Sequence, residues 1–244
     1  MDRRMAEREP QREIDLSVPW LEPYKEAAAV GGASFGTLLW RSEEFQRTRF
    51  RVLSEMIDLT GRVVIDCGCG RADLLAYLAA RDIAYRAYVG IDALAVMVEH
   101  CESRIRNQNL LRASATLGDF ASGTDTFTNY IRNLGAGTHA IGGGGEVLVF
   151  SGSLNTFEQP QALDVLARAW EAISPAPGAE RPGAALIFNF LSSCCGPKWQ
   201  TADTGPAHRF DTKAMLAFAL ERTSKVSFRQ DYLDGHDATI AMLA

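Results

Sequence analysis

The chain has 244 residues, 47% of them hydrophobic and 23% charged, with a formal net charge of −5. This length and composition are typical of one globular domain with a sizeable core. No apolar run approaches the ~20 residues of a membrane span, which argues against a membrane protein. No dense block of lysine or arginine occurs, which argues against a nucleic-acid partner.

The first 41 residues are predicted to form an N-terminal extension and an aromatic-rich cap. Residues 1–13 are highly charged, so we expect them to be disordered or a frayed helix. They lack the apolar core of a signal peptide, and we therefore expect a cytoplasmic protein. Residues 14–40 carry four large aromatic side chains, Trp20, Tyr24, Phe35 and Trp40. We expect these rings to pack on a sheet edge, with a place in a substrate pocket as the alternative.

Residues 42–244 are predicted to form one α/β domain, because strand-like and helix-like segments alternate after a first helix over 42–59. Strands are expected over 62–67, 86–91, 113–118, 145–151 and 183–191. Helices are expected over 72–81, 93–106, 124–134, 160–174 and 211–222. Such alternation predicts a parallel sheet with helices on both faces. Two more strand-like runs, 225–232 and 238–243, flank a turn and predict a terminal hairpin.

The segment from Val63 to Asp73 is the most informative part of the chain. A β-branched run ends in Asp66, and the chain then turns through Gly68 and Gly70, which lets the backbone approach a ligand closely. A dinucleotide would bring a pyrophosphate that Asp66 repels, and Asp73 replaces the third glycine of the dinucleotide fingerprint. S-adenosylmethionine (SAM) carries an ammonium and a sulfonium and no phosphate, so a carboxylate at this turn favours it.

This segment resembles the first motif of the class I SAM-dependent methyltransferases, hydrophobic-hydrophobic-Asp-x-Gly-x-Gly-x-Gly. The match holds through Gly70, and Ala72 stands in place of the last glycine. The resemblance covers about residues 42–244. It implies a Rossmann-like three-layer sandwich with a mostly parallel seven-stranded sheet, order 3-2-1-4-5-7-6, in which strand 7 is antiparallel. It also implies SAM as the cofactor, S-adenosylhomocysteine as the product, and a cofactor turn that includes Gly68, Cys69 and Gly70.

Two further acidic residues are expected at the cofactor. Asp92 ends the second predicted strand, 26 residues after Asp66, where an acid can accept both ribose hydroxyls, in SAM as in NAD, and Ala93 follows it. Asp119 ends the third predicted strand. In the resembled family an acid here accepts from the adenine amino group, and the next apolar residue, in this chain Phe120, packs on the ring. The alternative is that each acid only caps the helix that follows it.

The fourth predicted strand ends at Ser151, in the region where the resembled family contacts both the donor methyl and the acceptor. The chain reads Ser-Gly-Ser-Leu-Asn-Thr there, without an Asn/Asp-Pro-Pro-Tyr motif or a Pro-Cys pair. These departures count against methylation of exocyclic amines in DNA, of glutamine, and of C5 in pyrimidines. We place Ser151 in the cofactor site. Asn155 either hydrogen-bonds the acceptor or caps the following helix.

The remaining candidates are a base and a cation. His208 lies in the long loop 192–210, which we expect to fold over the acceptor, and it is the candidate general base. A solvated loop histidine is the alternative. Arg49 is a candidate clamp for the methionine carboxylate of SAM, with a surface arginine as the alternative. The five cysteines lack a chelating arrangement, so we expect free thiols and no metal.

Together these features predict a SAM-dependent methyltransferase that moves a methyl group by in-line displacement to an O or N atom of a small-molecule acceptor. The first alternative is a SAM-binding sensor or partner protein without turnover. A nucleic-acid or protein methyltransferase is less favoured because no basic block is present. Asp66 and Asp73 oppose a nicotinamide-dependent oxidoreductase. The sequence leaves the acceptor atom and the oligomeric state open.

Overall fold

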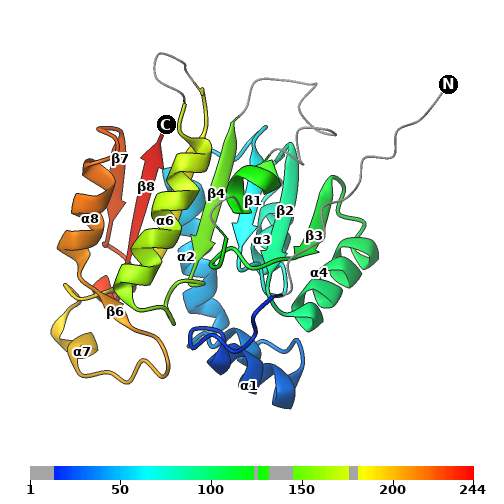
Figure 1. The fold of residues 1–244 in the computed structure, drawn as a ribbon, viewed down its shortest axis with the longest axis horizontal. Helices are drawn as coiled ribbons and strands as arrows, with labels where there is room; N and C mark the ends of the chain where they lie inside the picture. The colour runs from blue at the N-terminus through cyan, green and yellow to red at the C-terminus, as the bar shows by residue number, and fades with distance from the viewer. Residues whose placement is uncertain (1–13, 124–125, 132–144, 176–180) are drawn as a thin grey trace.

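A central sheet organises the protein (Figure 1). The computed structural model describes residues 14–123, 126–131, 145–175 and 181–244. Six strands pair in parallel: β1 Val63–Cys67, β2 Ala87–Asp92, β3 Ala113–Leu117, β4 Glu146–Ser151, β5 Ala185–Ser192 and β6 Arg209–Phe210. Two more complete the described sheet: β7 Val226–Arg229 and β8 Asp237–Leu243.

The strand order is β3-β2-β1-β4-β5-β8-β7. It confirms the predicted order, because β8 is the predicted seventh strand and β7 the predicted sixth. β8 also runs antiparallel to both β5 and β7, as predicted. The additional strand β6 pairs with the end of β5 and was not predicted, since two residues are too few to show a periodic pattern.

Helices cover both faces of the sheet, which confirms the three-layer sandwich. On one face lie α6 (Gln159–Ile173), α8 (Thr212–Leu220) and the helical residues 126–131. The other face is covered by α2 (Glu43–Met56), α3 (Asp73–Ala80) and α4 (Ala95–Asn107). The rest of the predicted helix 124–134 and the predicted disorder of 1–13 lie outside the described residues.

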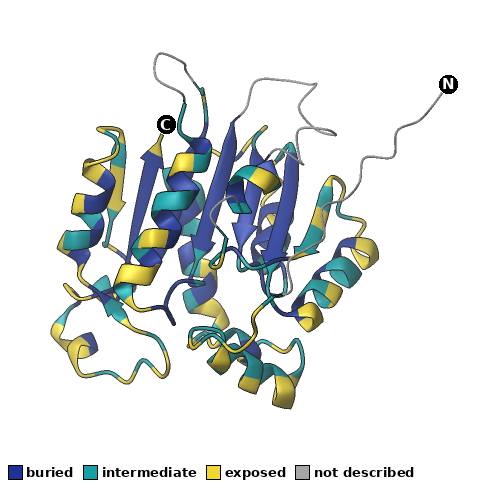
Figure 2. Cartoon of the chain, viewed as in Figure 1, coloured by how far each residue is buried: buried dark blue, intermediate teal, exposed yellow. Residues whose placement is uncertain are grey.

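Burial follows the layers (Figure 2). Every residue of β1 and β5 is buried, as expected for parallel strands covered on both faces, whereas the edge strands β3 and β7 are half-buried. A few polar side chains are nevertheless buried in the inner strands, among them Asp66 in β1 and Asn189 in β5. Both lie toward the carboxyl ends of their strands.

The segment from residue 14 to 41 lies across this same edge of the sheet (Figure 1). It contains α1 (Glu22–Gly31) and the short 3-10 helix η1 (Gly36–Leu38), and we call it the cap. The loop predicted over 192–210 contains a short helix, α7 (Pro197–Gln200), besides β6; a second 3-10 helix, η2 (Leu233–Gly235), precedes β8. Within the described residues, no helix is both long and apolar enough to cross a membrane.

Candidate active site

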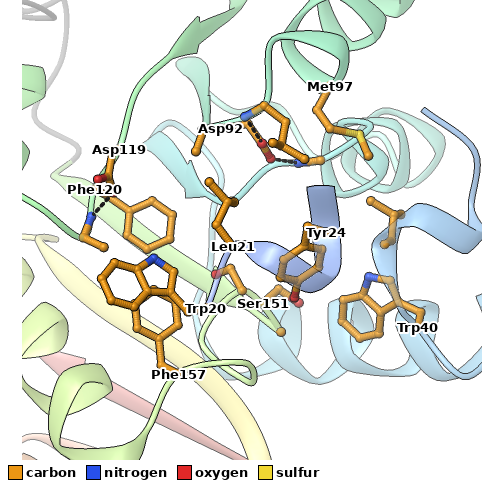
Figure 3. A pocket seen from close by; sticks show the side chains of 18 residues that line it. Trp20, Leu21, Tyr24, Trp40, Asp92, Met97, Asp119, Phe120, Ser151 and Phe157 are labelled. Carbon is orange, nitrogen blue, oxygen red and sulfur yellow. Dashed lines mark hydrogen bonds between the residues drawn. The ribbon is translucent and has the colours of Figure 1, made fainter. Parts of the chain in front are cut away.

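A pocket that is partly open to solvent lies between the cap and the carboxyl ends of β1, β2 and β4 (Figure 3). In an open parallel sheet this is the edge at which ligands bind. The turns after β1 to β4 supply most of the lining, and the cap supplies Trp20, Leu21, Tyr24, Leu38 and Trp40.

The turn after β1 brings bare backbone to the pocket wall. Gly68 has φ +80° and Gly70 has φ +51°, in the left-handed region that glycine adopts without strain. A Cβ at Gly68 would collide with Ser153, and one at Gly70 would lie 2.6 Å from Leu38 Cδ2. The Gly68 N–H donates to the carbonyl oxygen of Ile91 (2.8 Å), which holds the turn against β2. Both positions therefore require glycine.

Ala72 closes the same turn in a left-handed conformation, with φ 57° and ψ 39°, directly before α3. The conformation explains why the resembled motif carries glycine there. The Ala72 side chain is fully buried in the core cluster beneath the turn. Burial of a methyl-sized group, about 0.8 kcal/mol, offsets part of the roughly 1–2 kcal/mol cost of the left-handed backbone. The turn is therefore formed with alanine in place of the third glycine.

Asp92 joins the turns after β1 and β2. Its Oδ2 accepts from the Gly70 N–H (2.8 Å) and its Oδ1 from the Leu94 N–H (3.0 Å). Burial raises the pKa of Asp92, and these backbone donors oppose the rise. The carboxylate and the neighbouring Ala93 both line the pocket. Because each carboxylate oxygen can accept more than one hydrogen bond, Asp92 retains capacity for ligand donors.

Asp119 lines the pocket and has one carboxylate oxygen without a hydrogen-bond partner. The Gly118 N–H donates to the Asp92 carbonyl oxygen (2.9 Å), which places Asp119 beside the end of β2. Asp119 Oδ1 accepts from the Ala121 N–H (2.7 Å), whereas its buried Oδ2 has no hydrogen-bond partner. Phe120 follows and packs edge-on against Phe150, with ring centroids 5.5 Å apart. A buried carboxylate oxygen without a donor is costly, so this position fits a ligand that donates.

Asp66 has a different surrounding from the predicted one. It is 3% exposed and is not among the residues that line the pocket. The Tyr88 hydroxyl donates to Asp66 Oδ2 (2.6 Å). Burial raises the pKa of Asp66 to about 7, the Tyr88 hydrogen bond opposes the rise, and the charges of Asp92 and Asp73 add to it. The acids that line the pocket are thus Asp92 and Asp119, whereas Asp66 is buried inside the sheet.

Cys69 contributes its backbone to the turn and its side chain to the core. Its Sγ fills the space above Gly90, where a Cβ would come within 2.6 Å of the sulfur. A hydrogen bond with Cys101, followed by burial, raises the pKa of the Cys69 thiol well above its usual range. The side chain is therefore a neutral packing group rather than a ligand for the pocket.

The end of β4 forms the side of the pocket opposite Asp119. Ser151 lines it, and the Ser151 hydroxyl accepts from Asn189 Nδ2 (3.2 Å), while Asn189 Oδ1 accepts from the Gly152 N–H (2.9 Å). Ser153 also lines the pocket, and its buried hydroxyl has no partner. Trp40 packs so closely on Gly152 that a Cβ there would lie 2.8 Å from the indole ring.

Neither predicted catalytic residue lines the pocket. The His208 side chain is 48% exposed, with Nε2 3.7 Å from Glu158 Oε1, which corresponds to the solvated loop histidine. The Asn155 carbonyl oxygen accepts from the His208 N–H (2.7 Å), and the buried Asn155 Oδ1 has no partner. Asn155 does not cap α6, because the residue at the cap position is Glu158, whose N–H donates to Gln161 Oε1.

Arg49 forms neither of the two predicted arrangements. Its Nε and Nη2 donate to the two carboxylate oxygens of Asp237, each at 2.6 Å. The guanidinium also lies under Trp40, 4.3 Å from the ring centroid. Arg49 is therefore a buried structural cation that ties α2 to β8 through its Nε and Nη2. The sequence offered no local signal for this pairing, since Asp237 lies at the other end of the chain.

The cap aromatics are the site residues that the favoured interpretation of the sequence missed. Trp20, Tyr24 and Trp40 line the pocket, which is the alternative to packing on a sheet edge. Trp20 stacks on Phe157 with centroids 5.0 Å apart and the rings inclined by 19°. Burial raises the pKa of Tyr24 to about 12. The concentration of rings ahead of the first α/β unit was the available signal.

Among the described residues, no group of three or more histidine, cysteine, aspartate or glutamate side chains could hold a metal ion. No family model matches the sequence, and no curated protein matches it. The structure, by contrast, resembles many solved structures.

One similar structure is a SAM-dependent methyltransferase from Leishmania major, with a TM-score of 0.61, 12% identity, and coverage of 95% of this chain and 87% of that one. Another is magnesium protoporphyrin IX methyltransferase from Synechocystis with bound S-adenosylhomocysteine, with a TM-score of 0.54, 14% identity, and coverage of 93% and 94%. A third is an O-methyltransferase from neocarzinostatin biosynthesis in complex with SAM and 2-hydroxy-5-methyl naphthoic acid, with a TM-score of 0.55 and 16% identity. The match covers 90% of this chain but 60% of that protein.

The sheet order and these similarities show one fold class. The chain has the Rossmann-like fold of the class I SAM-dependent methyltransferases. At these sequence identities the similarity concerns the fold, and the function has to be argued from the pocket.

Proposed function

We propose that the chain is a SAM-dependent methyltransferase that transfers a methyl group by in-line displacement to an O or N atom of a small molecule. One observation carries the proposal. Asp92 and Asp119 both line the pocket beyond a glycine turn, and the buried Oδ2 of Asp119 has no hydrogen-bond partner. Acids at the ends of neighbouring strands suit the ribose hydroxyls and the adenine amino group of SAM.

The residues present fit this cofactor. Asp92 accepts the ribose hydroxyls, and Asp119 Oδ2 gains the donor that it lacks. Phe120 packs against the adenine ring, while the bare backbone at Gly68 and Gly70 admits the rest of the molecule. Arg49 does not fit the carboxylate clamp, because its Nε and Nη2 are paired with Asp237 and it does not line the pocket.

When bound, SAM supplies an electrophilic methyl group on a good leaving group. The chain's part is to align the acceptor and to exclude water, which can contribute roughly 7–11 kcal/mol to the rate. The cap provides the exclusion, since Trp20, Tyr24 and Trp40 cover the pocket from the side opposite the sheet. Ser151 and Ser153 provide hydroxyls on the wall formed by the end of β4.

Calorimetry tests the proposal. We expect SAM and S-adenosylhomocysteine to bind at micromolar concentrations and NAD⁺ to give no heat. Asp92→Ala should weaken SAM binding by about 1–3 kcal/mol, because the ribose donors lose a charged acceptor. Asp82→Asn, at an exposed turn, is the matched control and should leave affinity unchanged. Tight NAD⁺ binding, or full SAM affinity in Asp92→Ala, would refute the assignment.

A SAM-binding protein without turnover is the second candidate. It is favoured by the position of His208, which places no imidazole on the described pocket wall. The two candidates differ in one measurement, the release of S-adenosylhomocysteine in the presence of a panel of small acceptors. Release that depends on both an acceptor and Asp92 supports the enzyme. SAM binding without release of S-adenosylhomocysteine, whichever acceptor is present, supports the SAM-binding protein without turnover.

A further inference from the structure

The loop after β3, residues 118–123, lines the pocket without forming helix or strand. The backbone carbonyl groups of such a loop have no partners in a sheet or helix ladder, so each needs another donor. Asp119, Phe120 and Ala121 belong to this loop and line the pocket. Whatever holds the loop therefore also sets the position of groups that a cofactor would contact.

One side chain of the neighbouring helix α6 holds this loop. Arg168 Nη2 donates to the Ala121 carbonyl oxygen (2.7 Å). Its Nη1 donates to the carbonyl oxygens of Gly123 and, at 3.4 Å, of Phe120. Its Nε donates to Asp164 Oδ2 (3.1 Å), so every nitrogen of the guanidinium has a partner. The Arg168 side chain is 13% exposed and does not line the pocket. A planar fork of N–H groups suits several fixed acceptors at once, whereas a lysine ammonium is a single point charge.

The peptide group between Phe120 and Ala121 is held on both of its sides. Its N–H donates to Asp119 Oδ1 (2.7 Å), and its carbonyl oxygen accepts from Arg168 Nη1. The guanidinium thus fixes the orientation of the N–H that binds one oxygen of the Asp119 carboxylate. The other oxygen, Oδ2, is left without a hydrogen-bond partner.

The ring of Phe120 is held from the same direction. It stacks with Phe157, which precedes α6, with centroids 6.4 Å apart and the rings inclined by 21°. The backbone of Phe120 accepts from Arg168 on α6 itself. The end of the chain segment that leads into α6 and the helix therefore set both the ring and the peptide group of Phe120.

Building on the proposed function, we propose that Arg168 is a positioning residue for the adenine base of SAM. In that function Asp119 accepts from the adenine amino group and Phe120 packs on the ring. Arg168 touches neither the base nor the pocket and acts through the loop backbone. A fixed loop discriminates between bases, because Asp119 cannot turn away from a ligand that has a carbonyl in place of the amino group.

Calorimetric titration with S-adenosylhomocysteine and S-inosylhomocysteine tests the proposal. The two ligands differ only in the amino or carbonyl group of the base, so the ratio of their Kd values measures the preference for adenine. We expect Arg168→Met to lower this preference by about 10-fold. Arg168→Lys keeps the charge and loses the planar fork, so it should fold if Arg168→Met does not, and it should also lower the preference. A preference equal to that of wild type in the folded variant overturns the proposal.

Arg209 provides a matched control, because it holds a different loop in the same way. Its guanidinium donates to the carbonyl oxygens of three residues, Ser192 (3.1 Å), Trp199 (2.8 Å) and His236 (3.4 Å), and it does not line the pocket. Arg209→Met should lower the Tm, as Arg168→Met does, and leave the preference for adenine unchanged. An equal loss of preference in both variants assigns the effect to lost stability and overturns the proposal.

A double variant shows whether Arg168 acts through Asp119. Asp119→Asn should change the preference for adenine strongly in wild type and much less in the Arg168→Met background, because residue 119 is no longer held in one position there. Equal effects of Asp119→Asn in the two backgrounds contradict the proposal.

Wild type separates the positioning role from the proposed function. Failure of wild type to bind S-adenosylhomocysteine refutes the proposed function itself. Binding of S-adenosylhomocysteine with no preference over S-inosylhomocysteine, or with a preference that does not depend on Arg168, refutes the positioning role and leaves the methyltransferase proposal standing.

Discussion

Arg49 and Asp237 form a bidentate ion pair across 188 residues of sequence, with both N–O distances 2.6 Å. The pair joins α2 to the first residue of β8, and Trp40 covers the guanidinium. With side chains 7% and 0% exposed, each charge depends on the other for compensation. The ion pair thus connects the helix next to the cap with the strand that follows β7.

Removing one partner of this pair should destabilise the protein strongly. We expect Asp237→Ala to lower the free energy of unfolding by about 3–5 kcal/mol, because Arg49 is left buried and uncompensated. The double variant Arg49→Met with Asp237→Leu should recover most of that loss. Urea unfolding of wild type, Arg49→Met, Asp237→Leu and the double variant forms a double-mutant cycle. Additive effects of the two sites would contradict a direct pairing.

The buried acid in β1 predicts a pH dependence of stability. The pKa of Asp66 is about 7 in the folded protein, against about 3.8 for the free side chain. The folded state therefore holds a proton between pH 4 and 7 that the unfolded chain releases, so the free energy of unfolding falls as pH rises through this window. Relative to wild type, Asp66→Asn should gain up to about 4 kcal/mol of stability between these limits. Unfolding curves at several pH values measure this gain, and parallel profiles for the two proteins would count against it.

The Tyr88 hydroxyl should hold the pKa of Asp66 down. It donates to Asp66 Oδ2 and so stabilises the ionised carboxylate. In Tyr88→Phe we expect the pKa of Asp66 to rise further, by about one unit. Carbon-13 NMR of the carboxyl group follows this titration directly. Tyr85→Phe, whose hydroxyl donates to the Leu111 carbonyl oxygen, is the control and should leave the titration unchanged.

Exchanging the hydrogen-bonding character of residue 119 should change which base is bound. Asp119→Asn can present an amide N–H₂ where Oδ2 now stands, which opposes the adenine amino group. We expect S-adenosylhomocysteine to bind 10- to 100-fold more weakly, about 1–3 kcal/mol. S-inosylhomocysteine, which has a carbonyl at that ring position, should bind this variant better than it binds wild type. The same ranking of the two ligands in both proteins would exclude Asp119 as the adenine contact.

Short-range patterns in the sequence were enough to predict the sheet and the two acids that line the pocket. Glycines after β1 and acids at the ends of successive strands are short-range signals, and they led to Asp92 and Asp119, which do line the pocket. The terminal hairpin was equally readable, since its two runs are adjacent in the chain.

The predictions that differ from the structure concern residues whose neighbours come from distant segments of the chain. Arg49 has its partner in β8, and no periodicity within α2 reveals a carboxylate 188 residues away. Asp66 was expected to face a ligand, but the Tyr88 side chain of the neighbouring strand takes its hydrogen bond. His208 and Asn155 were predicted as catalytic residues from their positions in loops. In the structure they contact each other through a backbone hydrogen bond, and neither lines the pocket.

Trp40 connects the pocket to the C-terminal strand β8 through the two residues on which it packs. It packs on Gly152 at the pocket and on the Arg49 guanidinium, which holds the beginning of β8. A ligand that immobilises this indole therefore restrains the last strand as well, and thermodynamic linkage makes the effect reciprocal. Saturating the pocket should slow amide hydrogen exchange near Asp237, so that the C-terminal hairpin reports on occupancy without touching what is bound.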